Sequence, residues 1–385
     1  MSVEVGAAVS TQHDPLEAGG EAGAAAMSAL DGADPDLVLV FASGAHLAAP
    51  EAMLEGVRSA TGSAAVVGCG AGGVLAAGRE LESGTAVAVW AAAFDQVGVA
   101  TPFHATVEPD GIVKGLPSLE NATGAVVLSD PYTFPTDAVL GELAAAAPGV
   151  PVLGGLSSAR TQEGAGALFL QEEVCEEGAV GVRFDGIELL PCVSQGAAPV
   201  GREVTVTAAA GNMIHELAGR PALQTVERLI AEMSPRERTL VAGGLLIGIV
   251  IDSGKPEYAQ GDFLVRGVLG ADPDSGALAV GAAVHPGQVV RLHARDARSA
   301  DEDLRRALRL QNDAIASAGA AGALLFSCNG RGSAMFGHRD HDAGLVEHEL
   351  HGAPAAGFFA AGEIGPVGGR SFLHGFTATI AVFPR

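Results

Sequence analysis

The spacing between buried apolar runs and the glycines that follow them constrains the fold most. One continuous apolar run ends at Ser43, and the next run reaches Gly68, 25 residues later. The same step separates Ser129, at the end of a third run, from Gly154. Continuous apolar runs of this length are typical of strands buried on both faces. The sequence therefore predicts an internal repeat made of strand, loop, helix and strand.

A third copy of the pattern has Ser327 and Gly357 in the corresponding places, with a last strand at 376–383. Two parallel strands joined by a helix end at the same edge of a sheet, where open α/β sheets bind ligands. We therefore expect an α/β fold in which internally repeated strand-helix-strand units form mixed sheets. The loops expected to converge at the sheet edge follow Ser43, Gly68, Ser129, Gly154, Ser327 and Gly357.

The segment between the second and third copies has a different pattern. Short apolar runs separated by turn signals predict an antiparallel sheet there, and two amphipathic patterns predict helices. The expected strands are 203–209, 213–217, 245–251, 263–269, 277–283 and 288–292, and the expected helices are 221–233 and 301–317.

Composition narrows the class of protein. A chain of 385 residues is long for one hydrophobic core, which favours two domains or one duplicated domain. A net charge of -23 repels nucleic acid, so no nucleic-acid partner is expected. No apolar run reaches the roughly 18 residues of a membrane helix, and the start lacks a secretory pattern. We expect a cytoplasmic protein without membrane insertion.

The four cysteines are scattered, with no C-x-x-C pair and no neighbouring histidines at metal-ligand spacing. This distribution argues against a disulfide framework and against a zinc site. Four histidines lie between 338 and 351, where a metal site and an exposed amphipathic helix both explain them. No metal and no cofactor are expected.

The third copy carries the most charge. Arg331 and Glu363 lie in its glycine-rich loops beside Cys328 and Asn329. An arginine opposite an acid suits a zwitterionic amino acid, because the guanidinium binds the carboxylate and the acid binds the ammonium group. The alternative is that the two side chains pair with each other. Cys328 is either a nucleophile or a small buried residue at a strand end.

The remaining candidate ligand contacts lie in the loops of the first two copies. Asp130 is either a ligand carboxylate or a turn residue. The segment 68–73 matches G-x-G-x-x-G but lacks a following helix, so close backbone approach explains it better than a dinucleotide. The segment 155–159 resembles G-x-S-x-G but has Ala159 in the last place and precedes a strand. The candidates are Ser43, Gly70, Ser129, Asp130, Ser157, Ser158 and Arg160.

Several motifs in order resemble the FIST (F-box and intracellular signal transduction) sensory domain. They are TVTAAAGNMIHELAGRPALQTV, GDFLVRGVLGAD, LLFSCNGRG and GFFAAGEIGPVGGRSFLHGFT. The resemblance implies an N-terminal segment 1–35, a FIST N-terminal domain 36–218 and a FIST C-terminal domain 219–385. It also implies a bacterial module that senses a small polar ligand, with an amino acid as one candidate. We do not expect an enzyme. The signalling partner is not identified by any segment of the chain.

Two other functions remain open from the residues alone. One is an enzyme that acts on a small molecule through Cys328 or a serine nucleophile. The other is a scaffold whose surface binds a protein.

Overall fold

The computed structural model describes residues 3–62, 64–95, 97–159, 167–315 and 318–385, which fall into two compact units. We call the first the three-repeat unit; it comprises Met1–Val193, Leu304–Leu373 and Ala378–Arg385. We call the second the barrel unit; it comprises Ser194–Asp303 and His374–Thr377. In the described residues, no helix is long and apolar enough to span a membrane.

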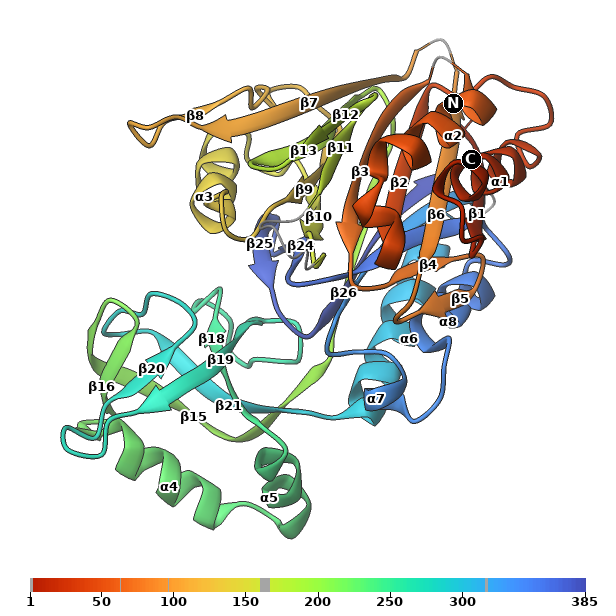
Figure 1. Ribbon diagram of the computed structural model, residues 1–385. Coiled ribbons are helices and arrows are strands. Elements are labelled where there is room, and N and C mark those ends of the chain that lie inside the picture. Colours follow the sequence, from red (N-terminus) through yellow and green to blue (C-terminus); the bar gives the residue numbers. More distant parts are fainter. Residues whose placement is uncertain (1–2, 63, 96, 160–166, 316–317) are drawn as a thin grey trace. The chain divides into compact units, whose positions relative to one another are not determined.

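The three-repeat unit is built from three stretches with a similar order of elements, except that the second has a two-residue strand where the first and third have a helix before the parallel pair (Figure 1). The first contains β1 (Val3–Ser10), α1 (Pro15–Met27), β2 (Leu37–Ser43), the 3-10 helix Gly44–Ala48, α2 (Pro50–Thr61), β3 (Ala65–Ala71), β4 (Val74–Ala76), β5 (Arg79–Leu81) and β6 (Ala86–Phe94). The second contains β7 (Val99–Val107), β8 (Val113–Lys114), β9 (Gly124–Ser129), α3 (Thr136–Ala146), β10 (Val152–Leu156), β11 (Leu168–Leu170), β12 (Glu173–Cys175) and β13 (Ala179–Asp185). The third contains β14 (Leu190–Gln195), α6 (Ala297–Ile315), β22 (Ala320–Cys328), α7 (Ser333–Phe336), α8 (His341–Glu349), β23 (Ala355–Ala360), β24 (Glu363–Val367), β25 (Arg370–His374) and β26 (Thr377–Pro384).

Each repeat contains one pair of parallel strands, and the connection between the two strands is helical. The pairs are β2 with β3, β9 with β10, and β22 with β23. The first strand of each pair is flanked on its other side by the last strand of the same repeat, which runs antiparallel. The predicted α/β fold with internally repeated units in mixed sheets is therefore confirmed.

The hairpin after each parallel pair completes a sheet of another repeat, which the sequence did not predict. Strands β4 and β5 of the first repeat extend the sheet of the third, through β23. Strands β11 and β12 of the second repeat extend the sheet of the first, through β3. Strands β24 and β25 of the third repeat extend the sheet of the second, through β10. The three repeats are thus interlocked in a cycle.

Three glycines mark the same place in the three parallel pairs. Gly68, Gly154 and Gly357 lie opposite Val40, Val127 and Leu325, respectively. At each glycine an added Cβ would overlap the carbonyl oxygen of the residue opposite. Glycine is therefore required there by close backbone approach.

This register corrects one predicted correspondence. Counted from the three glycines, Ser129 and Ser327 correspond to Ala42, not to Ser43. The equal spacing of 25 residues misaligned the first two repeats by one position. The connection between the two parallel strands is one residue longer in the first repeat than in the second. Since side chains alternate along a strand, a shift of one place reverses the face on which a side chain lies.

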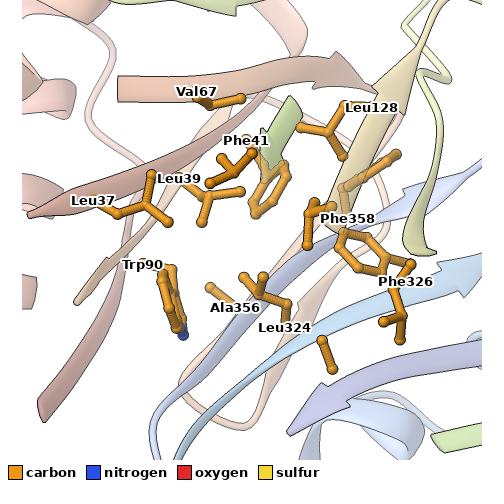
Figure 2. Packing of buried hydrophobic residues seen from close by; sticks show 14 of the residues in the cluster. Leu37, Leu39, Phe41, Val67, Trp90, Leu128, Leu324, Phe326, Ala356 and Phe358 are labelled. Carbon is orange, nitrogen blue, oxygen red and sulfur yellow. The ribbon is translucent and has the colours of Figure 1, made fainter. Parts of the chain in front are cut away.

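The inner faces of the three sheets surround one apolar core (Figure 2). Phe41, Phe326 and Phe358 form its aromatic centre; the Phe41 and Phe358 rings have centroids 5.2 Å apart, and Phe326 and Phe358 are 5.7 Å apart. Leu128 of the second repeat joins the same cluster. The outer faces are covered by helices: α1 and α2 on the first sheet, α3 on the second, and α6 and α8 on the third.

The barrel unit contains the predicted antiparallel strands. They close into a six-stranded barrel because β15 pairs with both β21 and β16, and the helix predicted at 221–233 is present as α4. The elements are β15 (Ala197–Ala210), β16 (Met213–Leu217), β17 (Arg220–Pro221), α4 (Ala222–Glu232), α5 (Pro235–Ala242), β18 (Leu245–Val250), β19 (Phe263–Ala271), β20 (Leu278–Val280) and β21 (Val289–Arg295). All of them except β17 are labelled in Figure 1. The barrel interior is filled by aliphatic side chains.

A buried histidine makes the stability of the barrel unit depend on pH. The His293 ring is fully buried, packs 4.8 Å from the Phe263 ring, and lies against Gly248. Burial lowers the pKa of His293 from 6.5 to about 4. Between these pH values the unfolded chain binds the proton and the folded chain does not, so the free energy of unfolding should fall by about 3 kcal/mol as the pH falls from 6.5 to 4.

We expect His293→Gln to flatten this pH dependence, measured by denaturant unfolding between pH 7.5 and pH 4. His215→Gln is the matched control, because His215 lies on an exposed strand position of the same unit. A variant at His293 that keeps the full slope would contradict this assignment.

Candidate functional site

Equivalent polar side chains end the first strand of each parallel pair. Ser43, Asp130 and Cys328 each follow a residue of the central core by two positions. The core residues are Phe41, Leu128 and Phe326, respectively. Residues two apart on a strand share a face, so Ser43 and Cys328, the last residues of β2 and β22, lie on the face of the central core, and Asp130 directly follows β9. All three are buried.

The ends of the second strands meet one another. The Ser157 hydroxyl donates to the Gly70 carbonyl at 2.7 Å, and the Ser158 hydroxyl donates to the Phe359 carbonyl. The backbone N–H of Gly72 donates to Ser158 Oγ at 2.9 Å. Loops from all three repeats therefore converge at this edge, and Gly70, Ser157 and Ser158 lie together there as linkers between the loops.

Three other candidates have hydrogen-bond partners within their own repeats. Ser43 donates to the Gly84 carbonyl at 2.9 Å, and the hydroxyls of Ser129 and Thr136 are 2.9 Å apart. One Asp130 oxygen accepts hydrogen bonds from the turn that follows it, including the backbone N–H of Thr133 at 2.9 Å. The turn interpretation of Asp130 thus has a structural basis. Arg160 lies outside the described residues.

Arg331 is buried in an ion pair that the sequence did not predict. Its Nε and Nη2 donate to the two carboxylate oxygens of Asp342 at 2.6 and 2.8 Å, and both side chains are almost fully buried. Burial, the largest single effect, lowers the pKa of Arg331, but the charge and hydrogen bonds of Asp342 together with the charges of Cys328 and Glu363 raise it overall. Among the described residues, Nη1 of Arg331 has no hydrogen-bond partner although it is buried.

Asp342 is the hub of this cluster. Besides Arg331, it accepts a hydrogen bond from the Ser327 hydroxyl at 2.7 Å, and His341 Nδ1 lies 2.8 Å from its other oxygen. The His341 ring stacks on Phe336. Burial alone would raise the pKa of Asp342, but the Arg331 guanidinium and these hydrogen bonds hold it well below its ordinary value. Asp342 is therefore charged at neutral pH.

Two carboxylates from the first repeat support the cluster. Glu80, on the hairpin that the first repeat adds to the third sheet, accepts hydrogen bonds from the backbone N–H groups of Asp342 and Ala343 at 2.7 and 3.0 Å. These groups open α8, where a carboxylate is favoured. Glu82 accepts from the backbone N–H and the hydroxyl of Ser333 at the start of α7. Burial and the charge of Asp342 raise the pKa of Glu80.

Glu363 occupies an apolar position of the repeat. The register of the hairpins places it where the other repeats have Val74 and Leu168, both of which belong to the central core. Glu363 is fully buried and is close enough to Arg331 for its charge to raise the pKa of that guanidinium, after the larger effect of Asp342. The predicted pair of opposite charges is therefore brought together, with Asp342 as a third member.

Cys328 and Asn329 complete this end of the third repeat. The backbone N–H of Gly330 donates to Cys328 Sγ at 3.4 Å, and that of Asn329 donates to the Ala360 carbonyl at 2.9 Å. Cys328 also contributes to the raised pKa of Arg331, behind Asp342. None of the four cysteines forms a disulfide bond.

The described residues contain no group of three or more His, Cys, Asp or Glu side chains that could hold a metal ion. His341 is instead part of the Asp342 cluster. His348 is exposed, with Nδ1 3.7 Å from Glu349.

Two cavities lie at opposite ends of the second sheet. One, of about 350 Å³, opens beside the loop before α3 and is lined by Pro131, Phe134, Thr136, Leu156 and Leu373. The other, of about 700 Å³, lies where the parallel strands begin, and its lining of proline, glycine and leucine includes one carboxylate, Glu188. Neither gathers opposite charges, so the buried cluster around Arg331 remains the site with the more specific chemistry.

These features define an α/β protein with three equivalent strand ends. In the part of the chain that the structure describes, only the third of them carries a buried arginine together with acids. The chain belongs to the FIST family: the FIST N domain matches residues 36–220 and the FIST C domain matches residues 222–366. FIST domains are associated with sensing in signal transduction.

Mycobacterial proteins are similar over almost the whole chain. The uncharacterized protein Rv0628c of Mycobacterium tuberculosis (strain H37Rv) is 42% identical over 386 residues, covering 99% of this chain and 100% of that protein. The uncharacterized protein Mb0898c of Mycobacterium bovis is 41% identical over 392 residues, covering 99% of each.

Proposed function

We propose that this protein is a cytoplasmic sensor that binds a small polar ligand through a carboxylate at the third repeat. The observation that carries the proposal is the buried Arg331 Nη1, which has no hydrogen-bond partner among the described residues. A buried donor left without a partner costs free energy comparable to a lost hydrogen bond. A ligand carboxylate at Nη1 would remove that cost, and hydrogen bonds between guanidinium and carboxylate are among the stronger ones.

The difference between the repeats supports the same location. The first two repeats have Val74 and Leu168 where the third has Glu363. Burying a charge in place of an aliphatic side chain costs stability, so it is retained more readily at a functional site than in a structural frame. The first two repeats then act as the frame and the third as the binding element.

An amino acid is the first ligand class to test, because Glu363 offers a carboxylate for an ammonium group near Arg331. The downstream partner of the sensor is not specified by this argument. Turnover of a bound compound would instead favour an enzyme, for which the contact between His341 and Asp342 offers an oriented base.

Arg331→Lys is the decisive variant for the carboxylate contact. Lysine keeps the positive charge beside Asp342 but lacks the third guanidinium nitrogen, so the buried ion pair survives while the ligand donor is lost. Some small carboxylates are expected to raise the Tm of the native protein. In Arg331→Lys, we expect the same compounds to give a much smaller Tm shift, which corresponds to a Kd that is weaker by about tenfold or more. The measurement is a thermal shift panel of amino acids and other small carboxylates, followed by a turnover assay on each compound that binds.

Arg183→Lys is the matched control, because Arg183 pairs with Asp185 on the second sheet and lies in a different repeat. Its ligand response should equal that of the native protein. Glu363→Gln separates the ammonium contact from the carboxylate contact. It should weaken the binding of amino acids and leave the binding of carboxylates without an ammonium group unchanged. Unchanged shifts in both Arg331→Lys and Glu363→Gln would refute the proposed site.

A further inference from the structure

Two groups that favour a thiolate lie near Cys328. The backbone N–H of Gly330 donates to its Sγ at 3.4 Å. The buried guanidinium of Arg331 is close enough for the two charges to interact. A hydrogen-bond donor and a nearby cation both favour the thiolate, which is the nucleophilic form of cysteine.

Cys69 shows the contrast within the same unit. It lies in the central apolar core with no exposed surface, and burial strongly raises the pKa of its thiol. Cys328 retains 7% exposure and lies at a strand end beside Arg331. Cys69 is thus an inert core residue, and Cys328 has the polar environment of a reactive one.

The repeat adds an independent argument. The register makes Ser43 and Asp130 the positions equivalent to Cys328, so each repeat carries a polar side chain at this place. The sequence also allowed Cys328 to be a small buried apolar residue. The other two repeats do not have an apolar residue at this position.

We propose that Cys328 is a nucleophile that reversibly captures the ligand held by Arg331, and that the ligand is a 2-oxo acid. This inference rests on the proposed carboxylate contact. A 2-oxo acid has a carbonyl carbon bonded directly to its carboxylate. A carboxylate at Arg331 Nη1 therefore presents an electrophilic carbon one bond away. Cys328 lies in the same turn, because the backbone N–H of Arg331 donates to the Cys328 carbonyl at 2.8 Å.

The chemistry is a simple addition. The Sγ–carbon bond forms while the π bond of the carbonyl breaks, and the oxygen takes up a proton equivalent to the one lost by the thiol. Nothing is oxidised or reduced and no group leaves, so the adduct reverts when the free ligand is removed. Reversibility suits a sensor. The amino acid with the same carbon skeleton lacks the electrophilic carbon and would form no adduct.

The matched reagents iodoacetate and iodoacetamide test the arrangement directly. Both alkylate a thiolate with loss of iodide, and only iodoacetate carries a carboxylate for Arg331. Cys175 is the internal control, because it is partly exposed and lies beside Glu173, which also raises its pKa after the effect of burial. We expect the rate ratio of iodoacetate to iodoacetamide, followed by peptide mass spectrometry, to be about tenfold higher at Cys328 than at Cys175.

Arg331→Lys should lower the ratio at Cys328 while leaving the ratio at Cys175 unchanged. Pyruvate should protect Cys328 of the native protein from iodoacetamide, and alanine should not. Cys328→Ser should reduce the thermal shift produced by pyruvate.

The outcomes separate this inference from the proposed function. If Cys328 is unlabelled in the native protein but labelled after denaturation, or if alanine binds and pyruvate does not, the inference is overturned and the carboxylate site stands. If no small carboxylate shifts the Tm and both cysteines show the same ratio, both proposals are wrong.

Discussion

Asp342→Asn is expected to lower the free energy of unfolding by about 3 to 5 kcal/mol, because it removes the charged partner that is hydrogen-bonded to the buried Arg331 guanidinium. The carboxylate now binds two nitrogens of that guanidinium, the hydroxyl of Ser327 and the ring of His341. An amide has one oxygen and no charge, so it satisfies only part of this set. Denaturant unfolding at pH 7 measures the loss.

Two further variants show whether the loss comes from the buried charge. Asp185→Asn removes the partner of the partly exposed Arg183 and should cost less than about 1 kcal/mol. Arg331→Met combined with Asp342→Leu removes both buried charges and should be clearly more stable than Asp342→Asn. A double variant as unstable as Asp342→Asn would contradict the buried-charge explanation.

Gly357→Ala is expected to destabilise the protein by about 3 kcal/mol or more, because the added methyl group overlaps the carbonyl oxygen of Leu325 on the paired strand. The neighbouring atoms are backbone atoms of a buried parallel sheet, which move only if the strand pairing changes. Gly68→Ala and Gly154→Ala should have effects of similar size, since these glycines hold the equivalent places.

Gly141→Ala is the matched control. Gly141 lies in α3 with no atom near the position of an added Cβ, so alanine should raise stability by up to about 1 kcal/mol through its higher helix propensity. Equilibrium unfolding of the four variants tests the comparison. A loss near zero at Gly357 would show that the parallel pair is not held as closely as described.

The charged residues of the site were only partly predictable. Arg331, Glu363 and Cys328 stood out because polar side chains after buried strands are unusual and gather at one sheet edge. Asp342 was missed because it lies in a segment whose histidines suggested either a metal site or an exposed helix. The useful signal was energetic: an arginine in a buried loop needs an acid, and Asp342 at the start of a helix was available.

The support from Glu80 had no local signal. Glu80 lies 262 residues from Asp342, on a strand of three residues, Arg79–Leu81. Such short strands carry too little alternation to reveal their partner. Their pairing with another repeat depends on which sheet edge is left open after the longer strands have paired.

The sequence by itself determined the repeated parallel strands, the helices between them, the antiparallel strands of the barrel unit and the family. Buried strands and amphipathic helices leave a periodic pattern in consecutive residues, which is readable without a structure. Only the tertiary structure decided which hairpin completes which sheet, that Ser43 corresponds to Asp130 and Cys328, and that Asp342 meets Arg331. These depend on contacts between residues distant in the chain, whose geometry is set by the packing of the whole unit.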